Sequence, residues 1–245
     1  PQIKALETGD LAQMSTAQLG SLTTEQMGAL TTSQTVSLTT DQIRSLKPAQ
    51  VQALSTASVA ALVTDQVKLL STAQLSALTT SQVRALQTAD LAVLRSAQVG
   101  GLTAAQVSAL STGQVSSLGT TQLQGLTGTQ IKALSTAQVS TMGTDQITAL
   151  SSSQVQALTA DQLNSLGTQA LNSIDTADIA ALTGSQARGL STAAVAALSS
   201  DQVKALTSTQ LSVLTANQIQ ALEEEDVALL STTQLSSLSE NQVKA

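Results

Sequence analysis

Apolar residues recur along this chain with a period of eight, and the period never slips. From residue 7 onward the sequence divides into 29 complete octapeptides that run from Glu7 to Leu238, with partial units at residues 1–6 and 239–245. The consensus is Ser/Thr-Thr-x-Gln-Val/Ile/Leu-x-Ala/Ser-Leu, and its residues are numbered as positions 1 to 8 of the unit. The pattern predicts one continuous repeat array over residues 1–245.

Two positions of the unit carry the predicted core. Position 8 is Leu in 26 of the 29 units, and the exceptions are Met14, Met142 and Ile174. Position 5 is apolar in every unit except at Thr35, and its smallest occupant is Ala187. Medium-sized apolar residues at fixed positions are typical of a close-packed interior. Positions 3 and 6 vary and carry many of the charges, so we expect them to face solvent.

The spacing of the core positions excludes a strand and a single long helix. The two positions are separated by three and then by five residues, and an odd spacing places residues on opposite faces of a strand. In an unbroken helix, eight residues at 100° each would rotate the apolar stripe by about 80° per unit. The pattern therefore favours a helix that is interrupted once per octad.

The interruption is predicted at position 1. Ser or Thr there, followed by Gln at position 4, matches the capping box at the start of a helix. Position 4 is Gln in 22 units, and in four others it is Asp (Asp10, Asp90, Asp178 and Asp226), which indicates that a side-chain acceptor matters. Pro48 stands at position 2, the first helical residue, where proline is tolerated. Each octad is expected to begin its own helix of about one and a half turns.

One octad is too small to fold alone, so successive coils must stack. Burying one Leu and one Val gains about 3–6 kcal/mol, whereas ordering eight residues costs roughly 12 kcal/mol. Two sets of residues recur in phase with 24 residues: the glycines Gly119, Gly143 and Gly167 at position 1, and Leu69, Val93 and Val213 at position 7. A 16-residue grouping shows some bias too. We expect an all-α solenoid of very short helices, one per octapeptide, with about three octads per coil.

The amino-acid composition excludes most enzyme chemistry. The chain has no His, Cys, Trp, Tyr or Phe, so the commonest acid/base group, the thiol nucleophile and most metal ligands are missing. With a net charge of −6 and no aromatic residue, the chain offers neither a basic stripe nor a stacking platform for nucleic acid. We expect no enzyme activity, no cofactor, no catalytic or metal-binding residue and no nucleic-acid partner.

Two surface features are candidate binding sites. Glu223, Glu224, Glu225 and Asp226 form an acidic cluster that could hold Ca²⁺, but a solvated helix N-terminus explains the same run better. Thr occupies position 2 in 18 units, and such a ladder suits ice or glycan binding, although capping explains most of it. Exposed Ser and Thr could also accept O-linked sugars.

The run LSTAQLSALTTSQVRAL, residues 70–86, resembles the octapeptide arrays of the kind ALTTxQVxAL found in very large bacterial proteins. Those proteins are often described as surface, adhesin-like or haem-utilisation proteins. The resemblance covers essentially the whole chain and implies an extracellular or cell-surface repeat region that assembles as a filament or sheath. Haem ligation is not expected, because the chain lacks His and Tyr.

These observations predict a structural protein that forms an extended rod, filament or sheath, extracellularly or at the cell surface. The alternative is an adhesive or ice- or glycan-binding repeat surface. Only 11% of residues are charged, which favours self-association, and no apolar run reaches the roughly 18 residues of a membrane span. The repeat lacks polar capping units, so we expect a segment of a longer array.

Overall fold

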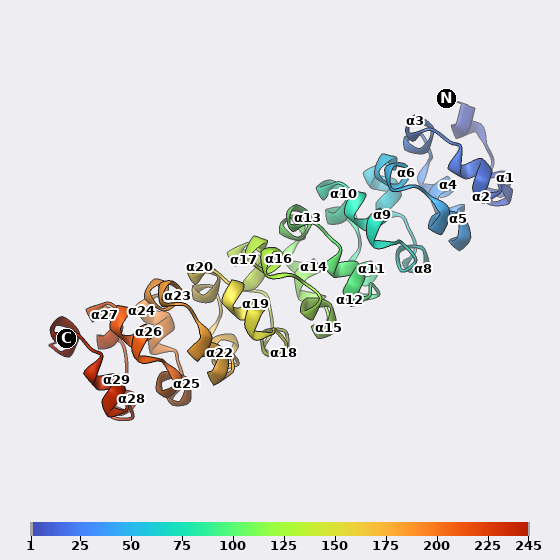
Figure 1. Ribbon diagram of the computed structural model, residues 1–245. Helices are drawn as coiled ribbons and strands as arrows, with labels where there is room; N and C mark the ends of the chain where they lie inside the picture. Colours follow the sequence, from blue (N-terminus) through green and yellow to red (C-terminus); the bar gives the residue numbers. More distant parts are fainter. Residues whose placement is uncertain (1, 245) are drawn as a thin grey trace. The chain divides into compact units, whose positions relative to one another are not determined.

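The computed structural model describes residues 2–244, and within them all regular structure is helical. A turn of 3-10 helix, η1 (Gln2–Ala5), precedes α-helices of four to six residues. Figure 1 shows that consecutive helices meet at sharp corners. The α-helices are α1 (Thr8–Gln13), α2 (Thr16–Gly20), α3 (Thr24–Gly28), α4 (Thr32–Ser37), α5 (Thr40–Ser45), α6 (Pro48–Ala53), α7 (Thr56–Ala60), α8 (Thr64–Val67), α9 (Thr72–Ala77), α10 (Thr80–Ala85), α11 (Thr88–Ala92), α12 (Ser96–Gly100), α13 (Ala104–Ala109), α14 (Thr112–Ser116), α15 (Thr120–Gln124), α16 (Gly128–Ala133), α17 (Thr136–Val139), α18 (Thr144–Thr148), α19 (Ser152–Ala157), α20 (Ala160–Asn164), α21 (Thr168–Asn172), α22 (Thr176–Ala181), α23 (Gly184–Gly189), α24 (Thr192–Ala196), α25 (Ser200–Ala205), α26 (Ser208–Val213), α27 (Ala216–Gln220), α28 (Glu224–Val227), α29 (Thr232–Ser236) and α30 (Glu240–Val243).

The chain divides into two compact units, which are described separately. Unit 1 ends at Leu126 and contains η1 and α1 to α15. Unit 2 begins at Thr127 and contains α16 to α30. The octapeptide register runs through both units unchanged.

Each helix starts and stops where the octad dictates. In α5 the N-cap Thr39 is extended (φ −69°, ψ 162°), and the C-cap Leu46 is extended again (φ −60°, ψ 136°). Two consecutive extended residues, at position 8 and at the next position 1, therefore make the corner. No described residue has a positive φ, so the corners need no glycine.

Helices three apart in the chain pack against each other, which gives three columns of stacked helices in each unit. In unit 1 the columns are α1, α4, α7, α10, α13; α2, α5, α8, α11, α14; and α3, α6, α9, α12, α15. The same spacing holds in unit 2, as in α16, α19, α22, α25 and α28. One coil therefore contains three octads, or 24 residues. This confirms the all-helical solenoid of very short helices predicted from the sequence.

The predicted core positions are buried through the described chain, apart from a few at its outer coils. Leu123 at position 5 is 0% exposed and Leu126 at position 8 is 4% exposed. Thr35, the polar exception at position 5, is also 0% exposed, and its Oγ1 donates to the Thr31 carbonyl at 3.0 Å. A hydroxyl that bonds to its own helix can occupy an apolar interior at little cost.

Position 4 forms a third buried row beside the two predicted core positions. Gln42, Gln106 and Gln210 are each 2% exposed. Positions 1, 2 and 3 lie mainly at the surface, as in Thr39, Thr40 and Asp41. In the described part of the chain, no helix has the length and apolar character that crossing a membrane requires.

Candidate functional site

The oxygen of each position 4 glutamine caps its own helix. In α5 the backbone N–H of Thr39 donates to Gln42 Oε1 at 2.8 Å, and the Gln42 N–H donates to the Thr39 hydroxyl at 3.3 Å. This is the capping box predicted from the sequence. Where position 1 has no hydroxyl, the glutamine half persists: Gly119 N–H donates to Gln122 Oε1 at 2.8 Å.

The nitrogen of the same carboxamide bonds to the preceding coil. Gln42 Nε2 donates to the carbonyl oxygens of Leu11 at 2.9 Å and Met14 at 2.8 Å, which lie 31 and 28 residues earlier. These carbonyls belong to the C-terminal end of α1 and to the corner that follows it. Other glutamines with the same bond include Gln34, Gln50, Gln66, Gln74, Gln82, Gln98, Gln106, Gln114 and Gln122 in unit 1, and Gln162, Gln186, Gln202, Gln210, Gln218, Gln234 and Gln242 in unit 2.

We call this row of position 4 glutamines the glutamine ladder. The last carbonyls of a helix lack partners within the helix. The ladder supplies hydrogen-bond donors to them from the following coil. Each such hydrogen bond adds about 0.5–1.5 kcal/mol net, and losing one partner in a buried place costs more than that. The ladder therefore joins helix capping and coil stacking in one side chain.

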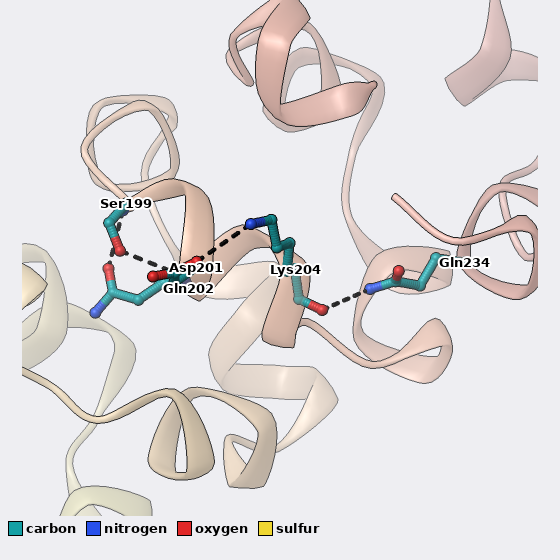
Figure 2. Close-up of polar contacts among 5 residues, drawn as sticks. All are labelled: Ser199, Asp201, Gln202, Lys204 and Gln234. Carbon is teal, nitrogen blue, oxygen red and sulfur yellow. Dashed lines mark hydrogen bonds and ion pairs between the residues drawn. The ribbon is translucent and has the colours of Figure 1, made fainter. Parts of the chain in front are cut away.

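Figure 2 shows one step of the ladder in unit 2 beside a surface ion pair. Ser199 N–H donates to Gln202 Oε1 at 3.0 Å, and Gln234 Nε2 donates to the Lys204 carbonyl at 3.0 Å. Lys204 Nζ lies 3.2 Å from Asp201 Oδ1, and the Asp201 side chain is 80% exposed. So exposed a pair contributes little to stability, whereas the ladder bond engages the backbone.

Two more pairs of opposite charges have the same three-residue spacing in the sequence. Asp41 and Arg44 in α5, and Asp65 and Lys68 at α8, form no ion pair among residues 2–244. Each Asp occupies the first turn of its helix, where the helix dipole favours a negative charge without a partner.

Two departures from glutamine in unit 1 keep hydrogen bonds to a neighbouring coil. Ser58 Oγ donates to the Leu30 carbonyl at 3.4 Å. Asp90 Oδ1 accepts from Thr64 Oγ1 at 3.1 Å. An ionised Asp cannot donate, but Gln87 at position 1 of the same unit donates to the Ala60 carbonyl at 3.2 Å. The lost amide donor is thus replaced from three residues away.

Unit 2 has four departures, at Ala170, Asp178, Ala194 and Asp226. The two alanines have no polar side-chain atom. Asp226 is 4% exposed, and its Oδ1 has no hydrogen-bond partner among the described residues. Position 4 therefore lacks glutamine at four places in unit 2, against three in unit 1 (Asp10, Ser58 and Asp90).

Position 6 provides a second kind of inter-coil hydrogen bond in unit 2. Gln156 Nε2 donates to the Ala181 carbonyl at 3.1 Å, and Asn164 Nδ2 donates to the Gly189 carbonyl at 2.9 Å. Both bonds span 25 residues and run toward the following coil, opposite to the ladder. Position 6 was expected simply to face solvent. Because the residue at position 6 varies from unit to unit, its pattern does not reveal this partner.

The acidic cluster at α28 does not assemble a cation site. Glu223, Glu224 and Glu225 are exposed, whereas Asp226 is buried. Within residues 2–244, no three carboxylates lie close enough together to hold a metal ion. A solvated helix start accounts for the three glutamates.

The amino-acid sequence of the repeat matches a known sequence family. A family model described as the ALTTAQ repeat matches residues 3–40, 36–72, 83–120, 116–152, 130–160, 171–208 and 188–216. The chain belongs to the ALTTAQ repeat family. The six letters of that name correspond to positions 7, 8, 1, 2, 3 and 4, so the ALTTAQ motif spans a corner and ends on the ladder glutamine. Comparison with curated proteins gives no match to this chain.

Proposed function

We propose that this ALTTAQ array is a structural element that forms an extended rod or filament, rather than a catalyst. The observation that supports the proposal most is the glutamine ladder, because each step joins one coil to the one before it with the same bonds. A contact that recurs every octad allows an array of any length, as in other solenoids. The bonds between coils are hydrogen bonds to backbone carbonyls rather than ion pairs between surface charges.

X-ray scattering of the full chain in solution tests the rod. A compact chain of this length has a radius of gyration of about 18 Å. About ten coils, at roughly 9–10 Å per stacked helix, make a rod near 100 Å long with a radius of gyration of about 30 Å. A value near 18 Å would contradict the proposal.

The proposal includes lateral or end-to-end association of copies and a location outside the cell or at its surface. A surface of mainly Ser, Thr and Ala with 11% charged residues provides little electrostatic repulsion between copies. Sedimentation across a concentration series measures the association, and protease treatment of intact cells tests the location. A chain that stays monomeric at all concentrations and is protected inside cells would count against this part.

A binding surface for ice or glycan is the second candidate, and one column of unit 1 favours it. The first helical residues of α2, α5, α8, α11 and α14 are all threonines, namely Thr16, Thr40, Thr64, Thr88 and Thr112. Because these helices stack on one another, the threonines recur once per coil. Inhibition of ice recrystallisation, abolished by Thr88→Glu, would support this function over a passive rod.

A further inference from the structure

A cavity of about 190 Å³ lies in unit 2, between the corner that joins α20 to α21 and the first turn of α24. Its lining includes Leu166, Leu171, Ser191, Ala194 and Ala197. α21 and α24 pack less closely than the other pairs of helices three apart in the described part of unit 2. The cavity therefore marks a local gap in one column.

The gap follows from the residues at positions 4 and 1. Ala194 is at position 4 of its unit, where a ladder glutamine would fill this space, and α21 has Ala170 at the same position. Gly167, the N-cap of α21, adds no side chain, and a Cβ there would meet no atom within 4 Å. What is missing is thus the volume and the chemistry of one glutamine side chain.

Asn164 replaces the hydrogen-bond acceptor of the missing glutamine. A ladder glutamine would accept a hydrogen bond from the Ser191 N–H, which here donates to Asn164 Oδ1 at 2.8 Å. Asn164 is held in place because its Nδ2 donates to the Gly189 carbonyl at 2.9 Å. The start of α24 is therefore capped without a glutamine.

The NH₂ donor of the missing glutamine is not replaced. At the matching register, the Leu158 carbonyl accepts from Gln186 at 2.7 Å and the Leu190 carbonyl accepts from Gln218 at 2.7 Å. Within residues 2–244, no group donates to the Leu166 carbonyl, although Leu166 lines the cavity and is 8% exposed. A buried carbonyl without a donor is unfavourable.

We propose that this cavity is a binding site for a small primary carboxamide. The ligand's NH₂ donates to the Leu166 carbonyl, as a ladder glutamine would, and its short aliphatic part contacts Ala194, Ala197 and Leu171. A carboxylate of the same shape has no N–H to donate and is repelled by the carbonyl. This site is independent of the proposed structural role.

Propionamide, which reproduces the glutamine side chain beyond Cα, is the probe. Saturation-transfer NMR on the full chain should show a saturable signal for propionamide and none for propionate. Ala194→Gln should abolish the signal, because the new side chain occupies the cavity. Ala196→Gln adds the same group on the exposed face of α24 and should leave the signal unchanged.

A second measurement establishes that the Ala194→Gln variant is folded. Because its side chain can donate to the Leu166 carbonyl, its thermal midpoint should rise above that of the natural chain. The proposal is overturned if propionamide gives no saturable signal, if propionate gives an equal one, or if a folded Ala194→Gln variant still binds propionamide.

Discussion

The two units share a core and differ in what joins their coils. Positions 5 and 8 have the same kinds of residue in both, and all three columns of unit 1 are continuous. In unit 2 one column is packed more loosely between α21 and α24, next to Ala170 and Ala194. The core residues in or just after these helices, Leu171, Ile174 and Leu198, are buried. The looser packing therefore coincides with the alanines at position 4 and not with a loss of the core.

The units also differ where position 6 meets the following coil. In unit 1, Gly100 lies so close to the Gly125 carbonyl that a Cβ on Gly100 would clash with it. In unit 2, Asn164 occupies the corresponding place and donates to Gly189. Close backbone approach and a side-chain hydrogen bond are thus two solutions to the same 25-residue contact.

The largest expected effect comes from truncating the core in matched places. Leu123→Ala in unit 1 should lower local stability by about 2–5 kcal/mol, because it removes a side chain that is 0% exposed. Leu171→Ala, at the same position beside the cavity, should cost less, because fewer atoms surround it. Hydrogen exchange of the peptides containing α15 and α21 measures both. Equal costs would show that the cavity does not loosen unit 2, and Gln124→Ala, at an exposed site, serves as the neutral control.

A methyl group tests the close approach in unit 1. Gly100→Ala should destabilise the chain by about 1–3 kcal/mol, because its Cβ meets the rigid carbonyl of Gly125. Gly113→Ala, in an exposed helical place with no atom within 4 Å of the new Cβ, should instead stabilise it by about 0.4–1 kcal/mol. Urea unfolding gives both values. If both alanine variants raise the midpoint of urea unfolding, the close contact between Gly100 and Gly125 is wrong.

Two glutamines separate the two halves of the ladder bond. Gln106→Met keeps the side-chain length but leaves the Leu78 carbonyl without its donor at 2.6 Å, so we expect a loss of about 1–3 kcal/mol. Gln18 is exposed, and within residues 2–244 its side chain forms hydrogen bonds only in its own helix cap. Gln18→Met should therefore lose only a capping bond, about 0.5–1 kcal/mol. Equal losses in hydrogen exchange would mean that the inter-coil half contributes nothing.

The smallest effect is expected at the surface charges. Asp201→Asn in unit 2 breaks the ion pair with Lys204, and Asp41→Asn in unit 1 has no ion pair to break. Both changes should alter stability by less than about 0.5 kcal/mol, because the pair is exposed. Thermal unfolding at low and high salt checks this. A salt-dependent loss confined to Asp201→Asn and well above that size would show that surface charge matters more in unit 2.

Much of the fold could be predicted from the sequence because the repeat makes every local signal visible many times. Leu at position 8, the Ser/Thr to Gln spacing and the 24-residue recurrence of Gly119 and Gly143 indicated core, corner and coil. The inter-coil half of the ladder could not be predicted, since the period does not tell which carbonyl faces Gln42 across the stack. The cavity depends on Ala194 and Asn164 together, and neither is unusual alone.

The ladder also has a direction. Each step runs from a donor late in the chain to carbonyls 28 to 31 residues earlier, as from Gln42 to Met14 and Leu11. During synthesis the N-terminal residues leave the ribosome first, so the acceptors for a new octad are already in place when its glutamine emerges. Each completed coil therefore presents the acceptors for the next one, and a ladder bond, unlike the position 6 bonds of unit 2, does not wait for residues not yet made.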